Sequence, residues 1–593
     1  MRQDLAANSE LQTLDYKCKF TSFDYIIVGG GGAGMVVATR LANASSSSRI
    51  LLLEVGGEPP VLNDIPTLSG ALQNQPANTF FLQLNPASQR FWFQKVMTTR
   101  GKMLGGSTST NFMMETKRIS TDGRLKIWEE ILNGIMRTYC PTSRNQRTTM
   151  EIMLVIPLQQ NITERGLLNV ARYDFEPGVD DFLAAALEKG YAIGDYNGAT
   201  QEGCHLATKI YFYFVCICKL NLIFLNTCRP VFSKVDATTQ DGWRESTYRA
   251  FYKDTGKPSN LCIKKYAHVI KINFQNVSGR PKAVGVTYKR QGNTRTVTAS
   301  KEIILSAGTF ESAKLLMLSG VGPAEHLHSL NIALVKDLPV GEKIQDHVST
   351  LAGPFLKSPS VNPGRDITIQ AATTFLTKGR GIFSGSDAGQ GFLKSLVAQP
   401  HYVDLQLIHT AFALYPQLPQ DLNHKWGIRI DILEKWFDPY HKLNTDASNP
   451  DDNPIIDPKF LTHPDDVEAL LYGFKKFVDL YENTEVLNTP LFYKPVPGCE
   501  NKVFKSDDYY RCVIRMFSFT MYHHVGSCSL GKVVDNQLKV MGIDGLRVID
   551  ASVMPRLPNG NTQAATIMIA EKGSDLIISH QRARASCPRR FMF

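Results

Sequence analysis

A glycine-rich turn near the start of the chain constrains its fold more than any other feature. Residues 23–34 read FDYIIVGGGGAG, and a helix is expected over 35–44. Gly29, Gly31 and Gly34 fit the pattern G-x-G-x-x-G, in which the glycines permit a tight turn, a close approach of pyrophosphate and helix packing on the strand. The helix N-terminus then offers free N–H groups to the phosphates. The pattern predicts a Rossmann-type nucleotide-binding unit.

An acidic residue follows the next expected strand. The apolar run 50–53 ends at Glu54, 20 residues after Gly34. A carboxylate at this distance accepts a hydrogen bond from a ribose hydroxyl and repels a 2′-phosphate. The site therefore suits a dinucleotide other than NADP, with FAD and NAD not yet separated.

Composition excludes some other functions. The net charge of +10, from 65 basic and 55 acidic residues, is spread along the 593 residues, whereas a nucleic-acid binder gathers its basic side chains into a patch. The apolar run 210–225 is shorter than the roughly 20 residues that span a bilayer, and Lys219 and Asn221 interrupt it. No CxxC pairs of the metal-binding type occur. We therefore expect no nucleic-acid partner, no membrane span and no metal site.

The cysteines leave the cellular compartment open. There are eleven cysteines, and Cys499 and Cys512 flank a polar loop, where they form either a disulfide or two unpaired thiols. Residues 1–20 contain no apolar segment typical of a signal peptide.

Further segments carry a resemblance to a known family. They read RGKMLGGSTSTN at 100–111, SAGTFESAKLLMLSGVGP at 306–323, VGEKIQDH at 340–347, YHHVGSCSLG at 522–531 and GLRVIDASVMPRLPNGNTQAATIMIAEKGSDLI at 545–577. With the glycine turn, they resemble the glucose–methanol–choline (GMC) oxidoreductases, and among these the insect FAD glucose dehydrogenase-like members. The resemblance covers 23–116 and 237–593 well and is poor between 117 and 165.

The resemblance implies a combined α/β and α+β fold with FAD as cofactor. A Rossmann-type FAD-binding domain would be joined to a substrate domain built on an antiparallel sheet. The expected FAD-binding segments are 20–116, 237–347 and 515–593, and the expected substrate domain is 348–514. Residues 117–236 are expected to be a substrate-domain or insert region with doubtful segments.

The resemblance also implies which residues touch the cofactor. The loop at Gly105 to Ser107 would run along the pyrophosphate and the flavin, although an ordinary glycine turn is the alternative. Val269 would contact the adenine, Asp550 and Ala551 the ribityl or phosphate chain, and the N-terminus of a helix over 562–577 the flavin's pyrimidine end. The predicted cofactor-binding residues are Gly29, Gly31, Gly32, Gly34, Glu54, Arg100, Gly105, Gly106, Ser107, Asn111, Val269, Asp550, Ala551, Asn561 and Thr562.

Two residues are predicted to be catalytic. His523 matches the family's histidine and has a side chain suited to take a hydroxyl proton near neutral pH, while His524 is expected to pack beside it. The second position, histidine or asparagine in the family, is Gln563, whose stem is one methylene longer than that of asparagine. A displacement of about an ångström can cost of order a hundredfold in rate.

Two functions therefore remain open. One is oxidation of an alcohol or sugar CH–OH group, with hydride passing to flavin N5 and electrons to a quinone or oxygen. The other is an impaired homologue that binds FAD or a ligand without turnover. Lyase chemistry, known on this fold, has no specific support.

Two stretches lack the resemblance. We hypothesise that 210–236 is translated intron and that part of 117–165 is out of frame, with genuine loop insertions as the alternative.

Overall fold

The computed structural model describes most of the chain from Cys18 to Ser586. The described residues are 22–68, 79–84, 96–116, 167–197, 229–357, 360–385, 389–398, 403–411, 417–437 and 460–586, together with 18, 20, 73, 75, 202–203 and 415.

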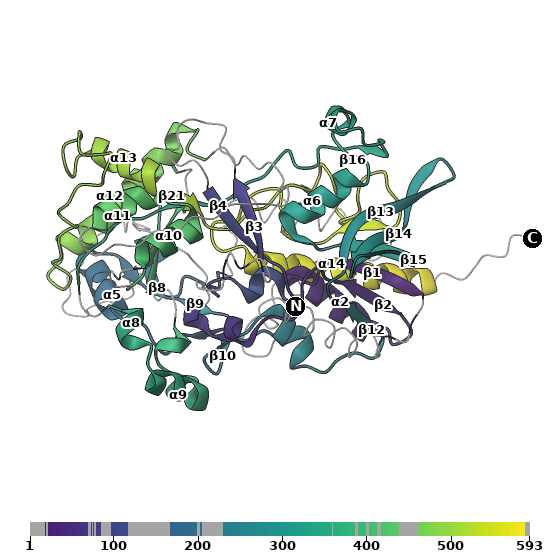
Figure 1. The fold of residues 1–593 in the computed structure, drawn as a ribbon, viewed down its shortest axis with the longest axis horizontal. Coiled ribbons are helices and arrows are strands. Elements are labelled where there is room, and N and C mark those ends of the chain that lie inside the picture. Colours follow the sequence, from purple (N-terminus) through teal and green to yellow (C-terminus); the bar gives the residue numbers. More distant parts are fainter. Residues whose placement is uncertain are drawn as a thin grey trace, which may run out of the picture.

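A parallel sheet forms the centre of one half of the molecule, on the right in Figure 1. Strand β1 (Phe23–Val28) pairs on one side with β2 (Ile50–Leu53) and on the other with β15 (Asn293–Leu305), and β12 (Leu261–Lys264) continues the sheet beyond β2. On the far side of β15 lies β22 (Leu546–Val548), also parallel. Residues 25–28, 50–53 and 303–305 in these strands are apolar and buried, as both faces of a parallel sheet are covered. The C-terminal segment therefore returns to the sheet that the N-terminal segment begins.

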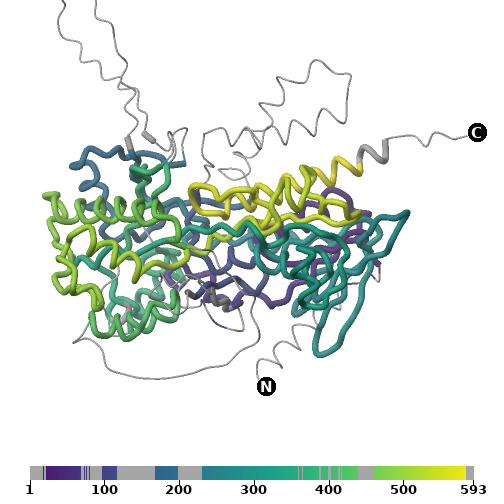
Figure 2. Tube along the Cα trace, turned by 90° about the horizontal axis from the view of Figure 1, so that it is seen from above, coloured from purple at the N-terminus to yellow at the C-terminus, as the bar shows by residue number. Residues whose placement is uncertain are grey.

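Three helices cover this sheet. Helix α2 (Gly32–Ala44) begins three residues earlier than expected, directly at the glycine turn, and α14 (Gln563–Ser586) continues past the expected end at 577. These two helices pack together, so the yellow C-terminal helix lies along the purple N-terminal segment in Figure 2. Helix α6 (Gly308–Leu318) follows β15 at the expected place.

An antiparallel meander extends the sheet at its edge. Strands β13 (His268–Val277) and β14 (Arg280–Arg290) precede β15 and pair with one another and with its first half. The first half of β15 therefore belongs to the meander, and its last residues belong to the parallel sheet.

The other half is built on a mainly antiparallel sheet. Its order is β20 (Leu405–His409), β19 (Gly389–Leu393), β8 (Arg229–Lys234) and β6 (Ala192–Ile193), and β7 (Glu202–Gly203) also pairs with β8. Both pairs that β19 forms are antiparallel, whereas β6 runs parallel to β8. This arrangement confirms the fold class expected from the resemblance.

The position of β8 corrects the intron hypothesis in part. Residues 229–236 fall inside the stretch that we interpreted as foreign, yet β8 lies in the middle of the sheet and places Val231 and Phe232 in buried clusters. Buried strand pairing of this kind requires these residues in the fold, so the hypothesis is wrong for them. Residues 210–228 and 117–165 lie outside the described residues.

Helices close the outer side of this second half. Helices α12 (Pro464–Glu482) and α13 (Asp507–Phe517) pack against each other, and α12 also covers β20. The remaining helices of this half are α5 (Val179–Glu188), α8 (Pro363–Asp366), α9 (Ile369–Lys378), α10 (Leu418–Trp426) and α11 (Ile430–Phe437).

Short ribbons connect the halves. Strands β3 (Thr79–Leu84) and β4 (Val96–Gly101) form one antiparallel pair, and β18 (Val348–Thr350) and β21 (Ser518–Thr520) form another. The second pair brings the VGEKIQDH and YHHVGSCSLG motifs side by side, because each motif adjoins one of its strands.

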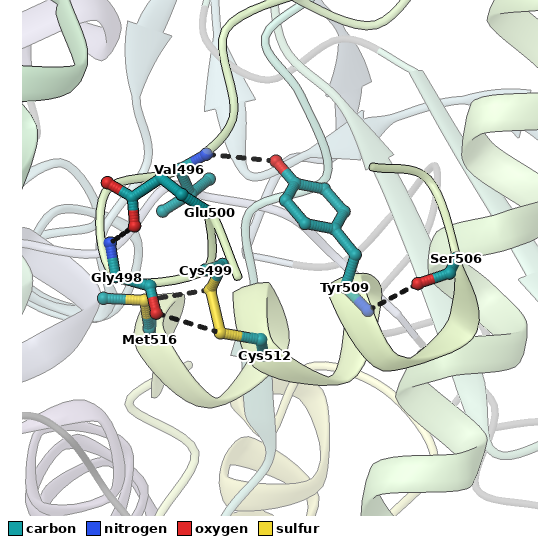
Figure 3. Close-up of a disulfide and its surroundings, with 8 residues drawn as sticks. All are labelled: Val496, Gly498, Cys499, Glu500, Ser506, Tyr509, Cys512 and Met516. Carbon is teal, nitrogen blue, oxygen red and sulfur yellow. Dashed lines mark hydrogen bonds between the residues drawn. A yellow bond between two sulfur atoms is a disulfide. The ribbon is translucent and has the colours of Figure 1, made fainter. Parts of the chain in front are cut away.

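Two disulfides are present among the described residues. Cys499 bonds to Cys512 beside α13, where Ser506 caps the helix by accepting a hydrogen bond from the N–H of Tyr509 (Figure 3). This decides between the two alternatives left by the sequence. A second disulfide, Cys18 to Cys262, was not predicted and ties the segment before β1 to β12.

Within the described ranges, no helix has the length and apolar character needed to cross a bilayer. The same residues contain no group of three or more potential metal ligands.

Candidate active site

The glycine turn is held in a form that other residues could not adopt. Gly29 has a φ of +98°, and a Cβ on it would lie 2.6 Å from the carbonyl oxygen of Ser306. A Cβ on Gly34 would lie 1.9 Å from the carbonyl oxygen of Gly29. The first glycine therefore permits the turn, and the third lets α2 begin directly against it.

The second glycine loop is docked on the first. The N–H of Gly105 donates to the carbonyl of Gly30 at 2.7 Å, and a Cβ on Gly106 would lie 2.7 Å from the Cα of Gly31. Gly105 and Gly106 both have positive φ. The N-terminus of α2 has no side-chain cap. The two glycine loops, at 29–34 and 105–106, therefore present backbone that no side chain covers beside a helix N-terminus. This site, which we call the cradle, suits a pyrophosphate.

Glu54 closes one end of this cradle. Its two carboxylate oxygens accept hydrogen bonds from the N–H groups of Gly30 at 2.7 Å and Gly56 at 2.8 Å. Burial raises the pKa of Glu54 to about 7, although both N–H groups act in the opposite direction. Each oxygen keeps a second lone pair with which it can accept a ribose hydroxyl.

A cavity of about 1210 Å³ runs from the cradle into the second half of the molecule. Its wall includes most of the predicted site residues, namely Gly29, Gly31, Gly32, Glu54, Arg100, Gly106, Ser107, Asn111, Val269, His523, Asp550, Ala551, Asn561, Thr562 and Gln563. Gly34 and Gly105 lie behind the wall, where they pack on the neighbouring turn. The structure therefore brings the two ends of the chain to one cavity.

Two predicted cofactor residues use their charges to brace the polypeptide. Arg100 donates to the carbonyl of Tyr522 at 2.6 Å, and burial lowers the pKa of its guanidinium. Asp550 accepts hydrogen bonds from the N–H of Gly308 at 2.9 Å and the hydroxyl of Ser312 at 2.6 Å. Arg100 thus holds the segment that carries His523, and Asp550 holds the start of α6.

His523 is joined to a second histidine that the sequence analysis did not assign. The Nδ1 atoms of His523 and His347 lie 2.9 Å apart. The carbonyl of Pro558 accepts a hydrogen bond from the His347 ring. A neutral imidazole has one donor, so we place the His347 proton on Nε2 and let its Nδ1 accept from His523. This leaves Nε2 of His523 unprotonated, so that its lone pair is an acceptor.

Asn561 supports the same tautomer independently. Its Oδ1 accepts a hydrogen bond from the hydroxyl of Thr116 at 3.0 Å, so its Nδ2 is the group 3.3 Å from Nε2 of His523. An amide nitrogen donates, and Nε2 therefore accepts. Burial, followed by the nearby charges of His347 and Arg100, lowers the pKa of His523 well below its ordinary value. The imidazole is uncharged at neutral pH and ready to take a proton.

A buried carboxyl group positions this histidine. Asp346 accepts hydrogen bonds from the N–H of His523 at 2.8 Å and from the hydroxyl of Thr520, and burial raises its pKa to about 7. His524 is fully buried, with its ring against Phe310 and its Nε2 3.2 Å from Asp346 Oδ2. Asp346 and His347 end the motif VGEKIQDH, so a signal for both was present in the sequence.

Gln563 lines the same cavity but is engaged elsewhere. Its Oε1 accepts from Asn111, and its Nε2 lies 3.3 Å from the hydroxyl of Thr238 and 3.4 Å from a carboxylate oxygen of Glu115. Asn111 in turn accepts from Arg244 at 2.7 Å. Within the described part of the chain, no hydrogen bond joins Gln563 to His523.

Comparisons with known proteins found relatives over most of the chain. Residues 228–349 and 442–570 match family models described as GMC oxidoreductase. The chain is 32% identical over 589 residues to an alcohol dehydrogenase [acceptor] of Pseudomonas putida, with 94% of this chain and 96% of that protein covered. It is 30% identical to an ecdysone oxidase of Bombyx mori and 29% identical to a glucose dehydrogenase [FAD, quinone] of Drosophila melanogaster, covering 94% of this chain and 82% and 86% of those proteins.

Solved structures share the fold. A formate oxidase of Aspergillus oryzae superposes with a TM-score of 0.70 at 21% identity, covering 95% of this chain and 99% of that one. An FAD-dependent oxidoreductase of Chaetomium thermophilum gives a TM-score of 0.69 at 20% identity, covering 95% and 100%.

Proposed function

This chain belongs to the GMC oxidoreductase family of FAD-dependent enzymes, and we propose that it oxidises the CH–OH group of an alcohol or sugar, with His523 as general base. The observation that carries the proposal is that Nε2 of His523 is unprotonated and can accept a proton. The contacts of His523 with His347 and with Asn561 both indicate this tautomer. We further propose that 20–116, 237–347 and 515–593 hold the cofactor and that 348–514 hold most of the substrate.

The cavity fits FAD at its glycine end. Bare backbone at Gly31 and Gly106, the uncapped start of α2 and the buried carboxylate of Glu54 would hold the pyrophosphate and the ribose. Val269 is buried on the same wall and would contact the adenine. When bound, FAD supplies the acceptor, at flavin N5, for the hydride that leaves the substrate carbon.

His523 takes the hydroxyl proton as the C–H bond breaks. Its Nε2 receives the proton, and the resulting positive charge is shared through Nδ1–H with His347. The buried carboxyl of Asp346 accepts a hydrogen bond from the backbone N–H of His523 and so holds the segment that carries the base. General base catalysis of this kind contributes roughly 10²–10⁴-fold.

An amide group beside the base is suited to hold the substrate oxygen. Nδ2 of Asn561 lies at Nε2 of His523, where a substrate hydroxyl would enter, whereas the amide of Gln563 is occupied by Asn111, Thr238 and Glu115. We therefore assign Asn561 as the donor to the substrate oxygen and Gln563 as the residue that positions Asn111.

Turnover requires an external acceptor for the two electrons. We propose a quinone or oxygen, because two relatives are named for an acceptor or a quinone and a third is named an oxidase. Oxygen consumption with hydrogen peroxide release, compared with reduction of a soluble quinone, separates the two.

Anaerobic reduction of the bound flavin tests the proposal. The purified yellow protein should bleach with an alcohol or sugar, and His523→Ala should keep its flavin while the reduction rate falls by about 10²–10⁴-fold. Unchanged reduction by His523→Ala would refute the base assignment. A wild-type protein that dithionite bleaches but no alcohol or sugar does would instead be a binding homologue without turnover.

Two further variants test the amide assignment. Asn561→Ala should lower the rate of flavin reduction at saturating substrate more than Gln563→Ala does. If Gln563→Ala lowers this rate more than Asn561→Ala does, Gln563 rather than Asn561 donates to the substrate oxygen.

A further inference from the structure

We propose that the substrate is a bulky, largely apolar alcohol with few hydroxyl groups besides the reacting one. This inference rests on the proposed function and names the substrate class of the same site. It comes from the wall of the cavity on the side away from the glycine cradle.

That part of the wall is made of large apolar side chains from several elements. They come from β3, β20, α11, α12 and β21, and they include Phe80, Leu407, Trp436, Leu470, Phe474 and Phe519. A wall of aliphatic and aromatic groups gains free energy by covering apolar surface and offers no partner to a hydroxyl.

Several polar side chains of this wall are already paired with protein groups, while Asp465 and Asp466 are exposed and lie where the wall meets solvent. In each of four pairs, a lining side chain exchanges a hydrogen bond with another side chain. The pairs are Ser395 with Asp404 at 2.5 Å, Gln406 with Gln390 at 2.8 Å, Tyr415 with Asp421 at 2.5 Å and Tyr481 with His409 at 2.6 Å. A few buried lining atoms lack a partner, among them the hydroxyl of Thr350. The wall therefore has room for one or two remote polar groups on a ligand.

Apolar side chains also reach the surface from the cavity wall. Ile367 and Val397 line the cavity and are 42% and 37% exposed. An exposed apolar group at the rim of a cavity favours entry of an apolar ligand over a strongly hydrated one.

Energetics then separate two classes of alcohol. Each ligand hydroxyl buried without a partner lowers affinity by roughly 5- to 100-fold. Each additional buried methylene raises affinity by about fourfold. A polyhydroxylated sugar is therefore expected to bind to this wall with lower affinity than an alcohol with a hydrocarbon skeleton.

Ring alcohols of matched size provide the test. Cyclohexanol and myo-inositol share one carbon ring and differ in their number of hydroxyls, and 4-cyclohexylcyclohexanol adds apolar bulk. Binding is measured from the perturbation of the flavin spectrum of the FAD-loaded protein, and reduction is measured separately under anaerobic conditions. We expect the bicyclic alcohol to bind at least tenfold more tightly than cyclohexanol, and cyclohexanol at least tenfold more tightly than myo-inositol or glucose.

The outcomes separate this inference from the proposed function. Tighter binding or faster reduction with glucose or myo-inositol overturns the inference and leaves the oxidoreductase function intact. Failure of the bicyclic alcohol to bind also overturns it. If the bicyclic alcohol binds as expected but neither it nor any sugar reduces the flavin, the substrate class stands and the proposed function fails.

A wall variant with a matched control locates the effect. Leu470 is half-buried on the wall, whereas Leu376 on α9 is 66% exposed and lies outside the lining. Leu470→Asn should weaken binding of the bicyclic alcohol by about tenfold and narrow its advantage over cyclohexanol, while Leu376→Asn leaves both unchanged. Equal binding by the two variants and the wild type would show that this wall does not contact the ligand.

Discussion

The two ends of the cavity are built in different ways. At the cofactor end, the turn from Gly29 to Gly34 and the carboxylate of Glu54 come from one short stretch, and the glycine loop at 105–107 is docked on them. At the catalytic end, Thr116, His347, His523 and Asn561 meet from four separate segments.

The difference lies in what each end is made of. The cofactor end is largely backbone, and its requirements appear directly as glycines at fixed spacing. The catalytic end is a network of side chains, in which each group depends on the position of the next. We therefore expect a substitution at the cofactor end to act through a steric clash with the backbone. A substitution at the catalytic end should act by misaligning the neighbouring side chains.

The largest combined effect, on cofactor binding and on stability, is expected from Gly34→Ala. Its Cβ would lie 1.9 Å from the carbonyl oxygen of Gly29, so α2 must shift away from the turn. We expect the purified variant to hold no flavin and to lose about 3 kcal/mol or more of stability as apoprotein. Flavin absorbance and urea unfolding measure the two effects.

Gly31→Ala is the matched control. Its Cβ would meet Gly106 only at 3.9 Å, an ordinary contact. We expect apoprotein stability within about 0.5 kcal/mol of the wild type but a large loss of FAD affinity, because the methyl group occupies the approach of the pyrophosphate. A flavin-loaded Gly31→Ala protein would contradict the proposed cradle.

The two disulfides compare the halves directly. Cys18–Cys262 closes 244 residues in the cofactor half, and Cys499–Cys512 closes 13 in the other. On chain entropy alone, replacing both cysteines by serine should cost about 5 kcal/mol for the first pair and about 3 kcal/mol for the second. Urea unfolding of the two double variants checks the order, and equal losses would show that loop length does not govern these bonds.

Two buried carboxyls should make stability depend on pH. The pKa of Glu54 rises on folding from 4.5 to about 7, so between these values the unfolded chain is ionised while the folded site is protonated. Stability of the apoprotein should therefore fall as pH rises from about 4.5 to about 7, by roughly 3 kcal/mol from this group.

Glu54→Gln should remove that fall. Asp346→Asn, at the catalytic end, should remove a similar fall that begins near pH 4, because the pKa of Asp346 rises from 3.8 to about 7. Urea unfolding midpoints from pH 4 to 8 measure both. A wild-type slope that survives in Glu54→Gln would mean that this carboxyl is ionised in the folded apoprotein.

The smallest effect is expected from His347→Leu. Loss of the ring removes the acceptor that holds Nδ1–H of His523, so its tautomer is no longer fixed. We expect flavin reduction by substrate to slow by about 10- to 100-fold, with flavin content unchanged. His326→Leu, in helix α7 (Ala324–Ser329) outside the cavity lining, is the control. A rate equal to the wild type would remove His347 from the positioning network.

The same contrast explains how much the sequence predicts. The strands at 25–28 and 50–53, the helix after the glycine turn and the return of 546–549 to the sheet were all predictable, because local apolar runs and glycines determine them. The Cys18–Cys262 disulfide was not predictable, because two cysteines 244 residues apart have no local sequence pattern that indicates their contact.

At the catalytic end, motifs indicated candidates but not their partners. His523 was placed by its motif, yet Asn561 had been grouped with the cofactor contacts. Glu115, Thr238 and Arg244, which hold Gln563 and Asn111, lie in no motif that marks them for this role. Tertiary packing decides whether the amide of Asn561 or that of Gln563 lies beside His523. Spacing along the chain does not indicate this packing.

The position of β22 has a consequence for biosynthesis. This strand covers one side of β15 in the parallel sheet, and the residues after it complete the cavity with Asp550, Asn561 and α14. A nascent chain that has emerged as far as α13 therefore carries every glycine of the cradle. One edge of its strand β15 is still unpaired, because β22 has not yet been synthesised. Because chains fold from the N-terminus during synthesis, assembly of the site waits for the last segment to leave the ribosome. A prematurely terminated product would expose that strand edge, which favours aggregation.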